Sequence, residues 1–176
     1  MRILFLLFVI SISTLSCAQD KRPLKGDTEF QKALNAEYKD ASTSPLKNKD
    51  RKDFEGLEFF KFDSTYVVKA SLERTPNSKW FNMKTTTFEL KGKPYRLNVY
   101  QGQDTMQQEG LENYLFLPFL DETNGEETYG GGRYIDARIP EGNIMEIDFN
   151  QAYNPYCAYN EKFSCPVVPR QNYLRT

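Results

Sequence analysis

The chain has no histidine among its 176 residues. Histidine is the usual general base near neutral pH and a common zinc ligand, so its absence excludes His-based catalytic triads and most zinc sites. An excess of positive charge is also missing, because 23 basic residues face 24 acidic ones. Nucleic-acid binding relies on clustered Lys and Arg that displace counterions, so this balance argues against a nucleic-acid partner.

Cysteine is scarce, with three residues in the chain. Cys17 closes an apolar leader, which leaves Cys157 and Cys165 for the folded part. In an oxidising compartment this pair predicts a disulfide that closes a short loop and stabilises the fold by about 2 kcal/mol. Two thiolates without a third cysteine or a histidine do not form a zinc site, so neither a metal nor a cofactor is predicted.

The one long hydrophobic run lies at the N-terminus, where Met1 and Arg2 precede about 13 mostly apolar residues. A membrane-spanning helix needs roughly 20. A charged start, an apolar middle and small residues after it are typical of a secretory signal, so export is expected. The sequence therefore divides into a signal or lipoprotein leader over residues 1–17, a polar tether over 18–27 and a single domain over 28–176.

Two interpretations of the leader's end remain open. Residues 14–17 (TLSC) resemble a bacterial lipoprotein box, although Thr14 stands where leucine is preferred and Leu15 where a smaller residue is usual. This interpretation predicts lipidation at Cys17 and a periplasm-facing membrane lipoprotein that touches the membrane only through its lipid anchor. The alternative is ordinary small-x-small cleavage after Ala18, which would give a soluble periplasmic or secreted protein.

Helical patterns are confined to the start of the domain. Thr28 and Gln31 match a capping box, and apolar residues then recur every four positions, which predicts a helix over about 28–39. Ser44 and Pro45 match an N-cap followed by proline in the first turn, so a short second helix is expected over about 45–53.

From residue 57 onward the apolar period changes to two, which is typical of half-buried strands. Seven candidate strands follow, at about 57–62, 65–73, 80–90, 95–100, 114–120, 134–139 and 144–149. The fold class expected is mainly β, or β-rich α+β: an antiparallel small barrel or sandwich of about seven strands with one or two N-terminal helices.

Residues able to do chemistry gather in the last third of the chain. Three glycines at 130–132 could cradle a phosphate, but they lead into a strand rather than a helix, so a bulge or a backbone crossing under an aromatic ring is favoured. Asp148 lies within an apolar strand and needs compensation, which favours a structural pair of Arg133 with Asp148 or Glu127 over catalysis. Acidic residues at 121–126 are interpreted as solvated turn residues.

Aromatic and amide side chains are mixed between residues 150 and 160, a composition that suits sugar or peptide recognition and equally a self-braced loop. The candidate binding residues are Glu127, Tyr129, Arg133, Asp148, Asn150, Tyr153 and Asn154. No catalytic residue is assigned.

The chain resembles the uncharacterised bacterial family known as domain of unknown function 1684 (DUF1684). The resemblance rests on residues 115–119 (LFLPF), 127–134 (ETYGGGRY), 148–155 (DFNQAYNP), 157–160 (CAYN) and 164–166 (SCP). It implies no established reaction, ligand or cofactor, so the functional prediction depends on the residues alone.

The sequence therefore predicts an exported cell-envelope protein, most readily a non-catalytic module that binds a small ligand, a glycan or an envelope protein. The alternative is a carboxylate-dependent hydrolase acting on a glycan or similar envelope substrate, with Glu127 and Asp148 as acid and base.

Overall fold

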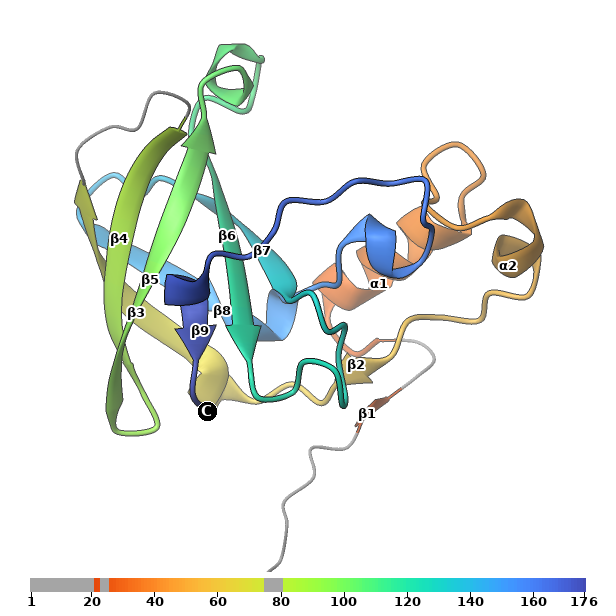
Figure 1. Cartoon of the computed structure of the whole chain (residues 1–176), viewed down its shortest axis with the longest axis horizontal. Coiled ribbons are helices and arrows are strands. Elements are labelled where there is room, and N and C mark those ends of the chain that lie inside the picture. The colour runs from red at the N-terminus through yellow and green to blue at the C-terminus, as the bar shows by residue number, and fades with distance from the viewer. Residues whose placement is uncertain (1–20, 23–25, 75–80) are drawn as a thin grey trace, which may run out of the picture.

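The computed structural model describes residues 21–22, 26–74 and 81–176 (Figure 1). The predicted leader, Cys17 and most of the tether lie outside the described residues. Within the described part, a β-barrel-like sheet forms one half of the molecule and two helices lie beside it.

Seven strands form the main sheet, which is nearly closed into a barrel. They are β3 (Val67–Arg74), β4 (Phe81–Leu90), β5 (Lys93–Gly102), β6 (Tyr114–Asp121), β7 (Arg133–Arg138), β8 (Ile144–Asp148) and β9 (Tyr173–Leu174). The order is β7-β6-β5-β4-β3-β8, all antiparallel, and β9 pairs with β6 in parallel. The predicted β-rich fold class is confirmed.

The barrel interior is filled by every second residue of its strands, as the period of two predicted. On β6, Leu115, Leu117 and Phe119 are buried in the core, where Phe119 and Phe149 meet edge to face with ring centroids 5.3 Å apart. Burial of this apolar surface is the main stabilising contribution to the barrel.

The side chain of Asn172 completes the hydrogen bonding of the sheet at the point where Pro118 interrupts it. Pro118 lies inside β6 but has no backbone N–H to donate to β5. The side chain of Asn172, which is 0% exposed, accepts from the N–H of Asn98 on β5 at 2.9 Å. Its amide nitrogen donates to the carbonyls of Asn98 at 2.8 Å and of Pro118 at 2.6 Å. One side chain thus bridges the two strands, which explains how a proline is tolerated there.

Helix α1 (Glu29–Lys39) begins where the sequence predicted it. Thr28 accepts from the N–H of Gln31 at 3.2 Å, and the Gln31 side chain accepts from the N–H of Thr28, so the capping box is formed. On the last turn Tyr38 is completely buried beside the rings of Phe54 and Tyr159. This small second core holds the helical part against the segment after β8.

The second helix is shorter than expected and its predicted cap is wrong. Helix α2 spans Asn48–Lys52, and Lys47 precedes it without a side-chain capping bond. The Ser44 hydroxyl instead donates to the Tyr38 carbonyl at 2.6 Å, and Pro45 is buried in an extended segment. Tertiary packing of this segment therefore overrides the local capping signal.

The strand expected at 57–62 is also reduced, to β2 (Phe59–Phe60). It lies outside the barrel and pairs with β1 (Lys21–Arg22), which belongs to the predicted tether. The seven strands of the main sheet are thus the six later candidates together with β9, which the sequence did not predict.

The glycine triplet allows a close backbone crossing under an aromatic ring, which is one of the two structural roles favoured from the sequence. A Cβ on Gly131 would lie 2.4 Å from the Tyr129 ring. Gly132 has φ +98°, and a Cβ there would lie 2.7 Å from the backbone oxygen of Phe119 and 2.5 Å from a methyl carbon of Val168. The triplet lets the chain pass under a ring and then against β6 before it enters β7.

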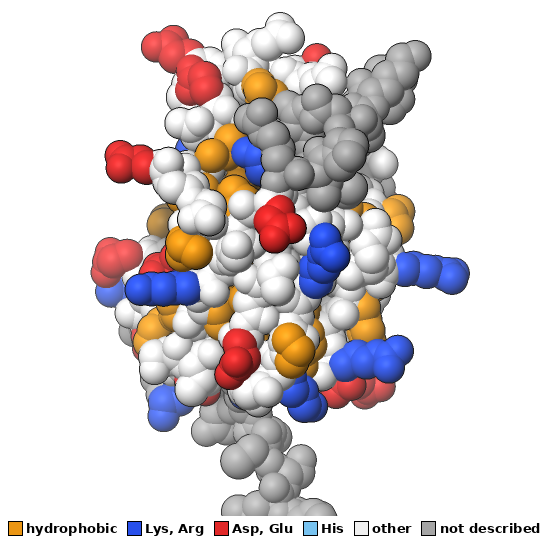
Figure 2. Space-filling model, turned by 90° about the vertical axis from the view of Figure 1, so that its left-hand side faces the viewer, with side chains coloured by type: hydrophobic (Ala, Val, Ile, Leu, Met, Phe, Trp, Pro, Cys, Tyr) orange, Lys and Arg blue, Asp and Glu red, His pale blue; other side chains and the backbone are white. Residues whose placement is uncertain are grey.

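Figure 2 views the barrel side of the molecule, where Lys, Arg, Asp and Glu side chains are interspersed. Within the described residues, no helix has the length and apolar character that a membrane span requires.

Candidate functional site

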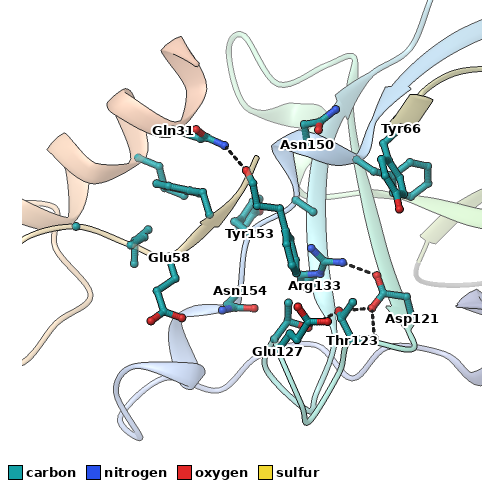
Figure 3. A pocket seen from close by; sticks show the side chains of 18 of the residues that line it. Gln31, Glu58, Tyr66, Asp121, Thr123, Glu127, Arg133, Asn150, Tyr153 and Asn154 are labelled. Atoms are coloured by element: carbon teal, nitrogen blue, oxygen red, sulfur yellow. Dashed lines mark hydrogen bonds and ion pairs between the residues drawn. The ribbon is translucent and has the colours of Figure 1, made fainter. Parts of the chain in front are cut away.

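A cleft of about 390 Å³ opens between one end of the barrel and the helical part (Figure 3). Its apolar wall comes from both halves of the molecule and includes Leu34, Phe54, Leu57, Phe60, Phe149 and Leu174. Its polar side chains come mainly from the ends of β6 and β7 and from the segment after β8. The cleft thus exists because these strand ends and β2 meet at the same place.

Arg133 is the central polar residue of the cleft, at the first position of β7. One of its terminal nitrogens donates to the Asp121 carboxylate at the end of β6, and the two side chains are 11% and 9% exposed. The guanidinium carbon lies 5.5 Å from the centroid of the Phe60 ring and 5.2 Å from that of Phe119. The guanidinium is therefore fixed by an ion pair and by cation–π contact with two aromatic rings.

Asp121 is itself held by the loop that follows it. One carboxylate oxygen accepts from the Thr123 N–H at 3.0 Å and from its hydroxyl at 2.5 Å, while the other oxygen faces Arg133. The Asn124 side chain accepts from the Asp121 N–H at 2.7 Å and donates to the Thr128 hydroxyl at 2.9 Å. These bonds lock the carboxylate, and through it the orientation of Arg133.

The Nε of Arg133 is buried and has no hydrogen-bond partner in the part of the chain that the structure describes. A buried donor of a charged group without a partner costs about 1–3 kcal/mol or more. Natural proteins rarely leave such a group unsatisfied without a reason, and an absent ligand or water is one of the common reasons. The Arg133 guanidinium is thus held in a fixed position, while its Nε–H has no acceptor among the described residues.

The predicted partners of Arg133 were wrong. Asp148 caps the short 3-10 turn after β8: one of its oxygens accepts from the Asn150 N–H at 2.9 Å, and the other from Gln151 at 3.1 Å. It does not line the cleft. Glu127 lies at the exposed rim, and the pair is made by Asp121, which the sequence had suggested was a solvated turn residue.

Five of the seven predicted binding residues line the cleft: Glu127, Arg133, Asn150, Tyr153 and Asn154. Asn150 is committed to the fold, because its amide group exchanges hydrogen bonds with the backbone of Asp63 at 2.9 and 3.0 Å. Tyr129, like Asp148, lies outside the cleft. Their part in binding stays a prediction.

The sequence did not indicate Glu58, Phe60 or Thr123, which also line the cleft. Figure 3 places Glu58 and Glu127 on either side of Asn154, at the polar side of the cleft. A carboxylate directly after a buried strand was a signal that could have identified Asp121. Nothing in the sequence near Glu58 and Phe60 indicates that β2 would reach the cleft from so far away.

The two cysteines lie side by side as free thiols, so the predicted disulfide is not formed in the structure. The N–H of Cys157 donates to the sulfur of Cys165 at 3.2 Å. Burial, and then the neighbouring Cys157 thiol, raise the pKa of Cys165, which therefore stays protonated at neutral pH. Among the described residues, no group of three or more side chains is arranged to hold a metal ion.

A family model described as "Protein of unknown function (DUF1684)" matches residues 52–176. No curated protein matches the chain. Among solved structures, the chain is similar to an uncharacterised protein of Haloarcula marismortui studied by solution NMR, with 29% sequence identity and a TM-score of 0.66. The match covers 83% of this chain and 85% of that one.

Proposed function

The chain belongs to the DUF1684 family of proteins of unknown function, and from that premise we propose that it is an exported, non-catalytic cell-envelope module whose cleft binds a ligand. The observation that carries this proposal is the state of Arg133. Its guanidinium is held by Asp121 and by two aromatic rings, yet its Nε has no partner among the described residues. A ligand that accepts a hydrogen bond there would relieve the cost of an unsatisfied buried donor.

The charges in the cleft indicate which kind of ligand fits. Its described lining holds one cationic side chain, Arg133, and three carboxylates, Asp121, Glu58 and Glu127. Because Arg133 is already paired with Asp121, an anionic ligand would be repelled by that carboxylate, so the ligand is expected to be neutral. Hydroxyl or amide groups can accept from Arg133 and donate to carboxylates, while an apolar face can pack on Phe60.

A neutral oligosaccharide has this combination of groups, and an N-acetylated sugar adds a carbonyl acceptor and a methyl group. We therefore propose a neutral glycan as the ligand class. A ligand that binds only the native state stabilises it by RT ln(1 + [L]/Kd), so the unfolding temperature rises with ligand concentration. The probes are chitotriose in its neutral form, the trimer of N-acetylglucosamine, together with cellotriose and maltotriose, first by thermal shift and then by calorimetry. We expect at least one of them to raise the unfolding temperature, and no shift with any of the three would count against the proposal.

A matched pair of variants assigns any binding to the cleft. Glu127 lines the cleft, whereas its neighbour Glu126 is also exposed but does not line it. Glu127→Gln is expected to weaken trisaccharide binding, because it replaces a charged acceptor by a neutral one. Glu126→Gln removes the same charge and is expected to bind as the wild type does. Equal effects of the two substitutions would place the ligand elsewhere.

A carboxylate-dependent hydrolase is the alternative, and the placement of Glu58 and Glu127 in the same cleft favours it. Glu58 would replace Asp148 in the expected pair, because Asp148 is used as a cap outside the cleft. Chromatography of chitotriose incubated with the protein separates the two proposals. Intact trisaccharide supports the binding module, and cleavage that is lost in both Glu58→Gln and Glu127→Gln supports the hydrolase.

Export, lipidation at Cys17 and a Cys157–Cys165 disulfide belong to the same proposal. The apolar leader and the lipoprotein-like box support export and the anchor, and the 3.2 Å contact from the Cys157 N–H to the Cys165 sulfur supports closure of the disulfide by an oxidant. Acyl labelling that is sensitive to globomycin tests the anchor, and its absence in a lipoprotein-processing host favours the soluble periplasmic or secreted form.

A further inference from the structure

A second groove, of about 450 Å³, lies against the other side of the wall made by Leu34 and Tyr153, which line both cavities. One side of this groove is a single face of α1, with residues at positions i, i+3, i+4 and i+7: Phe30, Ala33, Leu34 and Glu37. The other side is formed by β7 and by the segment from Tyr153 to Pro166.

Two carboxylates face this groove from opposite sides, Glu37 on α1 and Asp136 on β7. Tyrosine hydroxyls orient both of them. Tyr156 donates to one oxygen of Glu37 at 2.5 Å, and Tyr153 and Tyr114 donate to one oxygen of Asp136 at 2.8 and 2.7 Å. A carboxylate offers about four lone-pair sites. The second oxygen of each group accepts no hydrogen bond from a described residue, so both carboxylates retain capacity for a ligand.

Aromatic rings contribute much of the remaining lining: those of Phe30, Tyr134, Tyr153, Tyr156 and Phe163. Tyr134 and Tyr153 meet edge to face with centroids 6.0 Å apart, and Tyr156 and Phe163 are 5.2 Å apart. The faces of such rings are electron-rich and attract cations. The ammonium group of Lys162 already lies 4.7 Å from the centroid of the Phe163 ring.

The lining of the groove contains these two acidic residues and no lysine or arginine within the described chain. The groove therefore combines negative charge with aromatic and aliphatic surface. A bare metal ion does not match it, because the described residues hold no cluster of three or more metal-ligating side chains. An organic cation matches both features, since its charge is carried by or beside apolar carbon.

We propose that this groove binds a small organic ammonium ion, with its charged nitrogen between Glu37 and Asp136 and its alkyl groups against the tyrosine and phenylalanine rings. The site is separate from the glycan cleft and does not depend on it. Helix α1 provides one of the two carboxylates, so the N-terminal helical part has a recognition role in addition to packing against the barrel.

Choline and its neutral carbon isostere, 3,3-dimethylbutan-1-ol, test this inference on the full chain. Both have the same shape, and only choline carries a charge. Titrations followed by ¹H–¹⁵N NMR are expected to shift the amide signals of α1 and β7, with choline bound about tenfold more tightly than the alcohol. Equal affinity of the two compounds, or no shift with choline, would overturn the proposal.

Three variants test whether the tighter binding of choline depends on the carboxylates of Glu37 and Asp136. Asp136→Asn and Glu37→Gln each keep an oxygen that can accept from the tyrosine hydroxyls. Each removes one of the two carboxylates that share the tenfold advantage of choline, so each is expected to weaken choline binding about threefold while leaving the alcohol unaffected. Glu146→Gln removes an exposed carboxylate from β8 outside the groove and serves as the control. A loss with Glu146→Gln as large as that with Asp136→Asn would show general charge attraction and contradict the site.

Discussion

Replacing Asp121 by alanine is expected to destabilise the protein strongly, because it leaves the charge of Arg133 without its carboxylate partner. The two side chains are 9% and 11% exposed, so their ion pair is close to buried. Breaking a buried pair by removing one partner typically costs about 3–5 kcal/mol, whereas an exposed pair contributes about 0–1 kcal/mol. The stacking of the guanidinium between Phe60 and Phe119 persists in the variant but does not neutralise its charge.

Urea unfolding followed by circular dichroism measures this loss as a shift in midpoint at constant slope. For a domain of this size, about 3–5 kcal/mol corresponds to a melting temperature lowered by roughly 6–20 °C. The matched control is Glu161→Ala, which breaks the exposed pair of Glu161 with Lys47 and is expected to leave the midpoint near that of the wild type. A midpoint for Asp121→Ala no lower than that of this control would refute the buried pair.

The double variant Asp121→Leu with Arg133→Met distinguishes the effect of an unpaired Arg133 charge from that of the lost hydrogen bonds to Asp121. Replacing a buried ion pair by apolar residues of similar volume is often neutral or stabilising. We therefore expect the double variant to recover a large part of the stability that Asp121→Ala loses. No recovery would mean that the hydrogen bonds from Thr123 to Asp121, rather than the charge, account for the loss.

Three further predictions follow from particular contacts. Gly132→Ala should lower the free energy of unfolding, measured by urea unfolding, by at least about 1–2 kcal/mol, because the φ of Gly132 is +98° and a Cβ there would meet backbone. Gly130→Ala, where a Cβ would have no contact closer than 3.7 Å, should be near neutral, and an equal loss in both variants would contradict this. The free energy of unfolding should also fall as the pH rises above about 10. Burial, and then the hydrogen bond to the Glu37 carboxylate, raise the pKa of Tyr156 to about 12, so the native state keeps a proton that the unfolded chain releases. A urea midpoint that does not change across that range would contradict this. Oxidation should link Cys157 to Cys165 and raise stability by about 2 kcal/mol, measured by thiol titration and urea unfolding, and two titratable thiols after oxidation would exclude the bond.

Local patterns in the sequence were sufficient for the barrel and for α1. The apolar period of two from residue 57 onward predicted the six longer strands of the main sheet, and the Thr28 and Gln31 capping box predicted the start of the helix. Both signals depend on neighbours within a few residues, which is why a single sequence reveals them.

Features that depend on distant contacts were not predicted. A two-residue strand such as β9 has no period to detect, and it exists because Asn172 completes the hydrogen bonding around Pro118, far away in the sequence. The candidate site shows the same limit. Its aromatic and amide residues were identified from composition, but Asp121 was misjudged, because a turn carboxylate is normally solvated and only the folded loop buries it.

The side-chain Nε–H signal of Arg133 tests the central claim most directly, because this donor is the incompletely satisfied group around which the cleft is built. In a ¹H–¹⁵N NMR titration with chitotriose, the account predicts a saturable shift of this signal that is weakened in Glu127→Gln and retained in Glu126→Gln. A signal that stays in place while chitotriose shifts resonances elsewhere on the protein would contradict it.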